Sequence, residues 1–137
     1  MKLSVYGATG FIGSNFLKLY PNHEIIKRED RKPLSNEILY FISTVDNYNI
    51  YKDTSIDVKT NLAILAEVLN FCRKEDIVFN FISSWFVYGK LSSLPAKENS
   101  KCNPKGFYSI TKKCAEDLLV SFSETFKTKY RIIRLSN

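Results

Sequence analysis

Three glycines near the start of the chain, Gly7, Gly10 and Gly13, constrain its fold more than any other feature of the sequence. They follow an apolar run at residues 2–6 and open a helical pattern at residues 11–19. A strand, a glycine-rich turn and a helix in this order bind the pyrophosphate of a dinucleotide, because glycine lets the backbone approach the phosphates and the helix N-terminus supplies free N–H donors. The spacing is GxxGxxG, a variant of the commoner GxGxxG. An ordinary strand-to-helix turn is the alternative interpretation of the same residues.

The composition describes one globular domain. The chain has 137 residues, of which 45% are hydrophobic and 14% aromatic, which suffices for a single core and excludes a disordered chain. No apolar run approaches the roughly 20 residues that span a bilayer, and residues 1–15 lack the basic region and cleavage site of a secretory signal. We therefore expect a cytoplasmic protein without a membrane span.

The net charge of +6 comes from 20 basic and 14 acidic residues. The basic residues are dispersed among acidic ones, at 27–32, 90–105 and 127–134, and form no repeated basic face. This distribution favours a solvated basic surface over nucleic-acid binding. A positive field would also suit a small ligand rich in phosphate.

Apolar runs typical of buried strands alternate along the chain with amphipathic helical patterns. The predicted strands are residues 2–6, 24–27, 37–42, 77–82 and 130–135, and the predicted helices are residues 11–19, 56–73 and 107–126. Such alternation predicts an α/β fold, a doubly wound parallel sheet of about five strands with helices on both faces, in one domain over residues 1–137. The connection between the second and third strands is only about nine residues, short for a parallel crossover, so part of a βαβ unit is missing there.

The two longer helices each have a predicted core face, drawn from apolar residues three or four positions apart. In the helix at 56–73, with Ser55 as its N-cap, the predicted face is Leu62, Leu65, Leu69 and Cys72. In the helix at 107–126 it is Ile110, Cys114, Leu118, Phe122 and Phe126.

The cysteines and the single histidine are not candidates for chemistry. Cys72, Cys102 and Cys114 have no CxxC spacing, so neither a metal site nor a disulfide framework is expected, and Cys72 and Cys114 are interpreted as small buried groups. His23 lies just before a predicted strand and is interpreted as structural.

Two pairs of polar residues are better candidates. Ser83 and Ser84 follow the strand at 77–82, at the edge of the sheet where open α/β folds place their ligands, although serines also end strands as caps and turn formers. Tyr108 and Lys112 are four residues apart on one helix face. An ammonium group so placed stabilises a phenolate and lowers the tyrosine pKa, which makes a general acid/base. Tyrosine and lysine also occur at this spacing on many helices without such a role.

Together and in this order, these features resemble the extended short-chain dehydrogenase/reductase family, the NAD(P)-dependent epimerases and dehydratases of nucleotide sugars. The matching segments, which extend over the whole chain, are Gly7-Ala-Thr-Gly10-Phe-Ile-Gly13, Ser83-Ser84-Trp-Phe-Val87-Tyr88-Gly89, Tyr108-Ser-Ile-Thr-Lys112 and Arg134-Leu-Ser-Asn137. The resemblance implies a Rossmann-like fold, an NAD or NADP cofactor and a nucleotide-sugar substrate.

The resemblance also implies roles for individual residues. Ser84 would hydrogen-bond the reacting sugar oxygen, Tyr108 would pass a proton to or from that oxygen during hydride transfer, and Lys112 would lower the tyrosine pKa and hold the nicotinamide ribose. Ser84, Trp85 and Asn137 would face the substrate. The cofactor would contact Tyr108, Lys112 and the residues Gly7, Thr9, Gly10, Phe11, Ile12, Gly13, Arg28 and Glu29.

Departures from the family pattern narrow the reaction. The 4,6-dehydratases of the family carry Asp and Glu after the catalytic hydroxyl, where this chain has Trp85 and Phe86, which cannot transfer protons. We therefore expect epimerisation, or simple reduction or oxidation, rather than dehydration. Near the cofactor, Tyr40-Phe-Ile-Ser-Thr44 replaces the family's His-x-Ala-Ala. Where the family usually has an asparagine near the start of the next helix, this chain has Asp57, and Asn61 follows one turn later.

The end of the second predicted strand bears on the choice of cofactor. Glu29 matches the acid that binds the ribose hydroxyls of NAD, whereas Arg28 suits the 2′-phosphate of NADP. Both cofactors stay open, with NADP slightly favoured.

The chain ends at Asn137, inside the family's Arg-x-x-Asn segment, so we expect the C-terminal domain that grips the nucleotide sugar to be absent from it. Since catalysis needs a positioned substrate and excluded water, we expect weak or no turnover by this chain alone. The alternative is a non-catalytic NAD(P)-binding sensor or interaction module. By the family's habit, the two long helices would form a homodimer.

Overall fold

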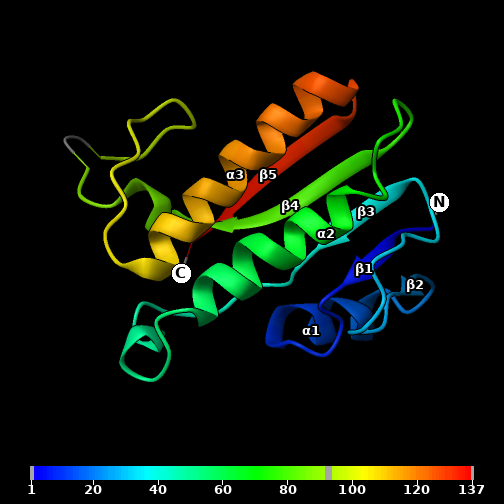
Figure 1. Cartoon of the computed structure of the whole chain (residues 1–137), viewed down its shortest axis with the longest axis horizontal. Helices are drawn as coiled ribbons and strands as arrows, with labels where there is room; N and C mark the ends of the chain where they lie inside the picture. Colours follow the sequence, from blue (N-terminus) through cyan, green and yellow to red (C-terminus); the bar gives the residue numbers. More distant parts are fainter. Residues whose placement is uncertain (1, 92–93, 137) are drawn as a thin grey trace.

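The computed structural model describes residues 2–91 and 94–136 and contains a five-stranded parallel sheet (Figure 1). Across the sheet the order is β2-β1-β3-β4-β5. The strands are β1 (Ser4–Tyr6), β2 (Glu24–Ile25), β3 (Glu37–Tyr40), β4 (Val78–Ser84) and β5 (Lys129–Leu135). The predicted doubly wound parallel sheet is confirmed. β2 is shorter than predicted, and β4 is longer because it includes both serines.

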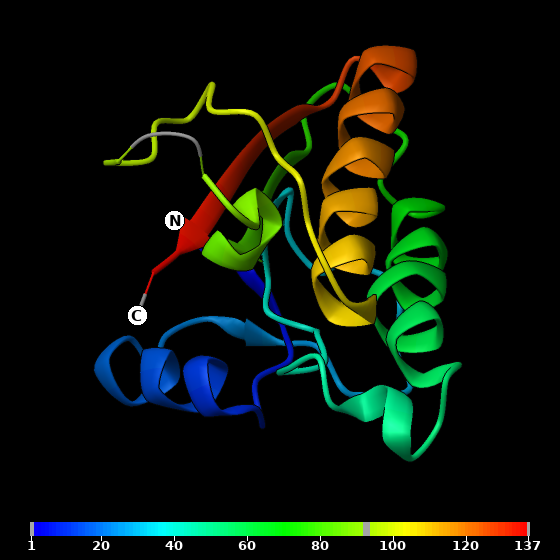
Figure 2. The same ribbon diagram turned by 90° about the vertical axis from the view of Figure 1, so that its left-hand side faces the viewer.

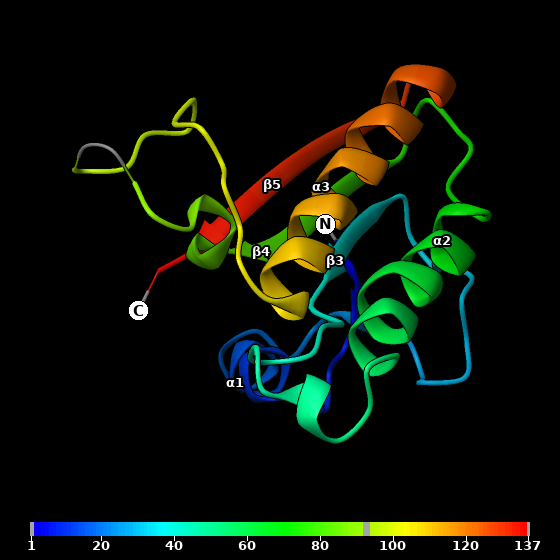
Figure 3. The same ribbon diagram turned by 60° about the vertical axis from the view of Figure 1, so that its left-hand side comes forward.

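Helices cover both faces of this sheet. The first, α1 (Phe11–Leu19), lies on one face, and α2 (Ile64–Leu69) and α3 (Phe107–Phe126) lie side by side on the other (Figures 2 and 3). Shorter helical turns are η1 (Asn49–Tyr51), η2 (Val58–Ala63) and η3 (Trp85–Tyr88). Because the strands are parallel, the loops after β1, β3 and β4 meet at one edge of the sheet. None of the helices in the described residues is long and apolar enough to cross a membrane.

The helix predicted at residues 56–73 is shorter and less regular than its pattern suggested. A π-helical stretch, η2, leads directly into α2, which ends at Leu69. The Cys72 amide then bonds to the Leu69 carbonyl at 2.9 Å, a bond three residues back that tightens and ends the helix. Ser55 stands at the start of this helix, since its carbonyl accepts from the Lys59 amide at 2.9 Å, but its hydroxyl donates to the Asp53 carboxylate at 2.6 Å instead of capping the helix.

The hydrophobic core lies between the sheet and the pair α2 and α3. The strands contribute Tyr6, Ile38, Tyr40, Phe79 and Phe81, the helices contribute Leu65, Val68, Leu69, Ala115 and Leu119, and the residues next to these elements contribute Ile26, Cys72 and Ile77. The core face predicted for the helix at 56–73 is confirmed: Leu65, Leu69 and Cys72 belong to the core, and Leu62 packs partly buried against it.

The predicted core face of α3 is wrong at Ile110, Cys114 and Leu118, whereas Phe122 packs partly buried against the core as predicted. Ile110 and Leu118 are each 45% exposed, and Cys114 is also exposed. The buried residues of α3 are instead Tyr108, Ser109, Thr111, Lys112, Ala115, Glu116, Leu119 and Ser123. Several of these are polar, and their burial is tolerated because they bond to groups on other elements. The exposed stripe of Ile110, Cys114 and Leu118 therefore points away from the sheet.

Within the described residues, a loop rather than a helix runs from β2 to β3 and crosses β1, which lies between them. Side chains of β1 hold this loop. The Ser4 Oγ accepts from the amides of Leu34 and Ser35 at 2.9 and 2.8 Å, and the Tyr6 hydroxyl donates to the Arg31 carbonyl at 2.7 Å. The short crossover expected from the sequence is confirmed.

Candidate functional site

The glycine turn joins β1 to α1 and leaves the start of α1 open. Gly7 has a φ of +78°, a conformation that favours glycine. A Cβ on Gly13 would lie 2.3 Å from the Gly7 carbonyl oxygen, so α1 packs on the turn too closely for any side chain there. Gly10 is the N-cap of α1, and no described side chain caps this helix. The first amides of α1 are therefore available to an anion.

The two serines that end β4 have different partners. The Ser83 hydroxyl is buried and donates to Glu116 Oε1 at 2.6 Å. The Ser84 hydroxyl oxygen accepts from the Phe86 amide at 3.3 Å and so caps η3. A hydroxyl that accepts in this way keeps its own proton for a ligand. Of the two, Ser84 is the one able to donate to a substrate.

Tyr108 and Lys112 are buried on the face of α3 that meets β4. The Tyr108 ring packs edge-on against the Phe86 ring, with 5.9 Å between their centroids. Lys112 is only 2% exposed. Its Nζ donates to the Ile82 carbonyl at 2.7 Å and lies 4.3 Å from the centre of the Phe81 ring. These contacts fix the ammonium group at the end of β4, one helical turn from Tyr108.

Burial determines the charge of Lys112. Removal from water lowers the pKa of Lys112 to about 7, and the Glu116 carboxylate, one turn later on α3, opposes this shift. Glu116 forms an ion pair with a different cation, Arg134. Arg134 on β5 donates to it in a two-point pair, from Nε to Oε1 at 3.0 Å and from Nη2 to Oε2 at 2.8 Å. Lys112 therefore changes charge close to neutral pH.

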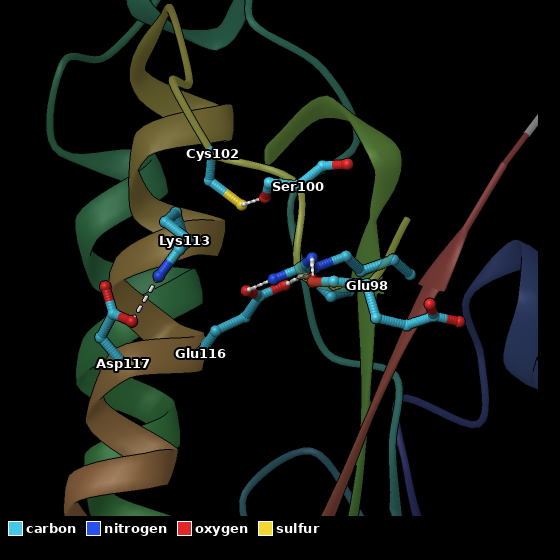
Figure 4. A network of polar contacts seen from close by, with 8 residues as sticks. Glu98, Ser100, Cys102, Lys113, Glu116 and Asp117 are labelled. Atoms are coloured by element: carbon cyan, nitrogen blue, oxygen red, sulfur yellow. Dashed lines mark hydrogen bonds and ion pairs between the residues drawn. The ribbon is translucent and has the colours of Figure 1, made fainter. Parts of the chain in front are cut away.

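The Glu116–Arg134 pair ties together the elements around the site. Glu116 reaches from α3 toward the segment that carries Glu98 (Figure 4). The Arg134 guanidinium also donates to the Glu98 carbonyl at 3.4 Å and lies 4.7 Å from the centre of the Tyr88 ring. Sequence reasoning included Arg134 only as part of a motif and missed Glu116. The i, i+4 spacing of Glu116 from Lys112 was the signal that could have found it.

A second buried polar group joins the loop after β3 to α3. Asn61 in η2 donates from Nδ2 to the hydroxyl oxygens of Thr44 and Thr111, both at 2.9 Å. The Thr44 amide donates back to Asn61 Oδ1 at 2.9 Å, and the Thr44 hydroxyl donates to the buried Asp57 carboxylate. Asp57 and Asn61, two departures from the family pattern, thus belong to one network.

One cleft of about 310 Å³ brings most of the predicted site residues together. It is closed on one side by Ser43, Thr44 and Val45, from the loop after β3. The predicted residues that line it are Gly10, Phe11, Ile12, Ser84, Trp85, Tyr108 and Lys112. Gly7 and Thr9 belong to the turn that leads to the cleft and Gly13 lies in the first turn of α1, and none of the three lines the cleft.

Two other predicted residues, Arg28 and Glu29, are not brought to this cleft. Glu29 lines a separate cavity of about 470 Å³ together with Asp30. Arg28 is exposed, and its carbonyl accepts from Arg31 Nη1 at 2.6 Å. Asn137 lies outside the described residues. The structure thus gathers the expected catalytic residues but not the pair expected to distinguish NAD from NADP.

Neither the cysteines nor the histidine join the site. Within residues 2–91 and 94–136, no cluster of three or more His, Cys, Asp or Glu could hold a metal ion. All three cysteines are free. Cys72 is buried as predicted, whereas Cys114 is exposed, because its side of α3 faces away from the sheet. His23 is structural: its Nδ1 accepts from the Leu3 amide at 3.3 Å, and its ring stacks on Phe16.

Comparisons with known proteins add a family and a fold. Residues 35–137 match the family model described as "NAD dependent epimerase/dehydratase family". This match begins after the glycine turn. No curated protein sequence matches the chain. Solved structures match over nearly all of it, glycine turn included. UDP-glucose 4-epimerase from Brucella ovis in complex with NAD aligns with a TM-score of 0.84 and 21% identity, over 97% of this chain and 51% of its own.

Two further solved structures give the same result. UDP-N-acetylglucosamine 4-epimerase from Methanobrevibacter ruminantium M1, in complex with UDP-N-acetylmuramic acid, aligns with a TM-score of 0.84 and 21% identity, over 97% of this chain and 54% of its own. RMD from Pseudomonas aeruginosa, complexed with NADPH, aligns with a TM-score of 0.83 and 20% identity, over 98% and 54%. The chain therefore spans about half the length of these similar structures.

Proposed function

The chain belongs to the NAD dependent epimerase/dehydratase family, and we propose that it binds a nicotinamide dinucleotide and supplies proton-transferring residues for hydride transfer on a nucleotide sugar. The observation that carries this proposal is the cleft in which the open start of α1 meets Ser84, Tyr108 and Lys112. In this proposal residues 1–137 form one dinucleotide-binding domain, which contributes the cofactor side of the active site.

The glycine turn fits the pyrophosphate of such a cofactor. A Cβ on Gly10 would meet only the Gly7 carbonyl oxygen, at 3.4 Å, so the space in front of Gly10 is open. The free amides and the positive dipole end of α1 lie at this space and suit an anion. Thr9, Phe11 and Ile12 complete the cofactor contacts. When bound there, the nicotinamide supplies the hydride donor or acceptor for a sugar carbon.

The catalytic roles follow from the contacts of three side chains. Ser84, whose proton is free, donates to the reacting sugar oxygen. Tyr108 gives a proton to that oxygen or takes one from it. Lys112, fixed on the Ile82 carbonyl, stabilises the phenolate that remains and contacts the nicotinamide ribose. Tyr108 and its neighbours are buried, which keeps water from competing for the proton.

The side chains after Ser84 favour epimerisation, or simple reduction or oxidation, over dehydration. Trp85 and Phe86 stack with 4.6 Å between their ring centroids, and both line the cleft. Neither side chain carries a titratable group, so neither can assist the loss of water. Trp85 also lines a larger cavity of about 930 Å³ with Tyr88 and Tyr130, which would hold part of the substrate.

Arg28 and Glu29 leave the cofactor open between NADP and NAD. The exposed Arg28 side chain favours the 2′-phosphate of NADP, and we keep a slight preference for NADP. Glu29 would hold the ribose hydroxyls of NAD. The relative affinity of the chain for NADPH and NADH decides between them.

A homodimer is supported by the exposed apolar stripe on α3, formed by Ile110, Cys114 and Leu118. Contiguous apolar side chains that are exposed to solvent often mark a surface that contacts another protein chain. The three free cysteines suit a reducing compartment such as the cytoplasm.

Reduction of NADP⁺ or NAD⁺ by nucleotide sugars tests the enzymatic part of this function. The chain is mixed with each cofactor and with UDP-, GDP-, CDP- and dTDP-sugars, and the absorbance of the reduced nicotinamide is followed. We expect a small signal with at least one sugar, which Tyr108→Phe abolishes because the hydroxyl that transfers the proton is gone.

An equal signal from the wild type and Tyr108→Phe would contradict the enzymatic proposal. The enzymatic proposal would also be contradicted if no signal appeared after a C-terminal half, of the kind that the similar structures contain, was added to the chain. Cofactor binding without turnover in that experiment would favour a non-catalytic NAD(P)-binding module, which the short span of the chain relative to those structures also allows.

A further inference from the structure

The helix that carries Tyr108 begins without a capping side chain of its own. The residue before α3 is Gly106, and no acidic residue stands in the first turn. The first backbone bond of the helix runs from the Ile110 amide to the Gly106 carbonyl at 3.0 Å. The amides before Ile110 therefore need acceptors from elsewhere in the fold. Tyr108 lies within this unsupported turn.

We propose that Asn47, in the loop after β3, caps α3 from a distance and thereby positions Tyr108. Asn47 Oδ1 accepts from the Ser109 amide at 3.2 Å. Ser109 is the third residue of the helix, and an N-cap side chain bonds to this same position. Asn47 Nδ2 also lies 3.1 Å from the Ser109 hydroxyl. The cap stands on this geometry alone, and the positioning role rests on the function proposed above.

Gly106 makes room for this cap. Its φ is +86°, and a Cβ there would lie 2.3 Å from Asn47 Oδ1 and 2.6 Å from Asn47 Cγ. The Asn47 side chain therefore occupies the space that a local capping residue would use. Ser109 is only 1% exposed, so its polar groups depend on Asn47 in place of water.

The same loop also forms a wall of the cleft. Thr44 and Val45 line the cleft, and Asn61 fixes Thr44 from the side of η2. At Asp46 the loop turns, because Asp46 Oδ1 accepts from the Tyr48 amide at 2.7 Å. One short segment thus contacts the space proposed for the cofactor and, two residues later, holds the first turn of α3. The location of Tyr108 relative to that space is set by this segment.

Amide exchange and ring signals measured by NMR test the proposal on the whole chain. The variants are Asn47→Ala, which removes the cap, and Asn47→Asp, which keeps the acceptor. Asn49→Ala is the matched control, because Asn49, at the start of η1 and two residues after Asn47, directs its Nδ2 to the Asp46 carbonyl and the Asp57 carboxylate rather than to α3. Should Asn47→Ala fail to fold, Asn47→Ser, a shorter acceptor, replaces it.

We expect Asn47→Ala to speed exchange of the Ser109 amide by about five- to tenfold, the effect of one lost helix cap. The ring signals of Tyr108, which the edge-on Phe86 ring shifts, should move in the same variant. Asn47→Asp, which keeps the acceptor, and the control Asn49→Ala should both show the Ser109 exchange rate and the Tyr108 ring signals of the wild type. A general loss of stability would leave the native Tyr108 ring signals in place, and it would speed exchange of the Ser109 amide no more than exchange of the other α3 amides.

Unchanged Ser109 exchange in Asn47→Ala would overturn the cap. Faster exchange with unmoved Tyr108 signals would overturn the positioning role. Titration of the same samples with NADPH separates this proposal from the proposed function. If Asn47→Ala changes Ser109 exchange and the Tyr108 signals but the wild type does not bind NADPH, the proposed function is overturned and the cap stands. If the wild type binds NADPH but Asn47→Ala changes neither signal, the cap is overturned and the proposed function stands.

Discussion

Lys112 combines a hydrogen bond suited to a cation with an environment that penalises charge. Burial lowers its pKa from 10.5 to about 7, so the folded chain loses this proton above about pH 7 while the unfolded chain keeps it up to about pH 10.5. The unfolded state thus binds more protons in this window, and the contribution of Lys112 to stability rises with pH.

Replacement of Lys112 by methionine should expose this dependence. Below pH 7 the variant avoids the full cost of a buried charge, and its stability relative to the wild type is then greatest. We expect that difference in the free energy of unfolding to shrink toward pH 10 by on the order of 3 kcal/mol. Urea unfolding of both proteins between pH 6 and pH 10 measures it. Parallel stability curves would mean that Lys112 titrates normally.

The Glu116–Arg134 pair joins α3 to β5 at the site. Glu116 is 2% exposed in its side chain and Arg134 19%, so removal of one partner leaves the other charge poorly solvated. We expect Glu116→Gln to lower the free energy of unfolding by about 2–3 kcal/mol, because breaking a buried pair is costly whereas replacing both partners is not.

A double-mutant cycle provides the control for this pair. Glu116→Leu with Arg134→Met should be less destabilised than the sum of the two single changes, as expected of groups in direct contact. Denaturant midpoints of the four proteins give the coupling. Additive effects would show that the pair contributes nothing beyond its separate side chains.

The order of strands and helices could be predicted because it depends on local periodicity, and the glycine turn and the strand-end serines are local signals too. The buried face of α3 could not. An apolar stripe at Ile110, Cys114 and Leu118 has the usual pattern of a core face, yet the sheet receives Tyr108 and Lys112 instead. The burial of Lys112 depends on an acceptor distant in the sequence, the Ile82 carbonyl, which no local pattern shows.

Two features of the site were invisible for the same reason. The π-helical stretch η2 brings Asn61 between Thr44 and Thr111, and nothing in its residues distinguishes it from an ordinary helix. The cap at Asn47 joins residues 62 positions apart. Arg28 and Glu29, predicted from their place after a strand, lie outside the lining of the cleft.

The exposed stripe on α3 predicts how whole molecules associate. If the stripe is covered by a second copy, a charge placed at Leu118 should break the dimer. We expect Leu118→Glu to be monomeric at concentrations where the wild type is dimeric, by sedimentation velocity. Ile133→Glu, on β5 and similarly exposed at 40%, is the control and should stay dimeric. A monomeric wild type, or a dimeric Leu118→Glu, would contradict this prediction.

In the function proposed for this chain, the glycine turn holds a nicotinamide dinucleotide in the cleft beside Tyr108 and Lys112. Gly10 allows a direct test, because its φ of −74° suits any residue and only the space in front of it would be lost. By contrast, Gly13→Ala should lower the melting temperature, since its Cβ would meet backbone.

The decisive measurement is titration of the chain with NADPH and with NADH, followed by nicotinamide fluorescence. We predict saturable binding by the wild type and a loss of about tenfold or more in affinity for Gly10→Leu, equivalent to about 1.4 kcal/mol or more, at an unchanged melting temperature. No binding by the wild type, or equal binding by Gly10→Leu, would contradict the account.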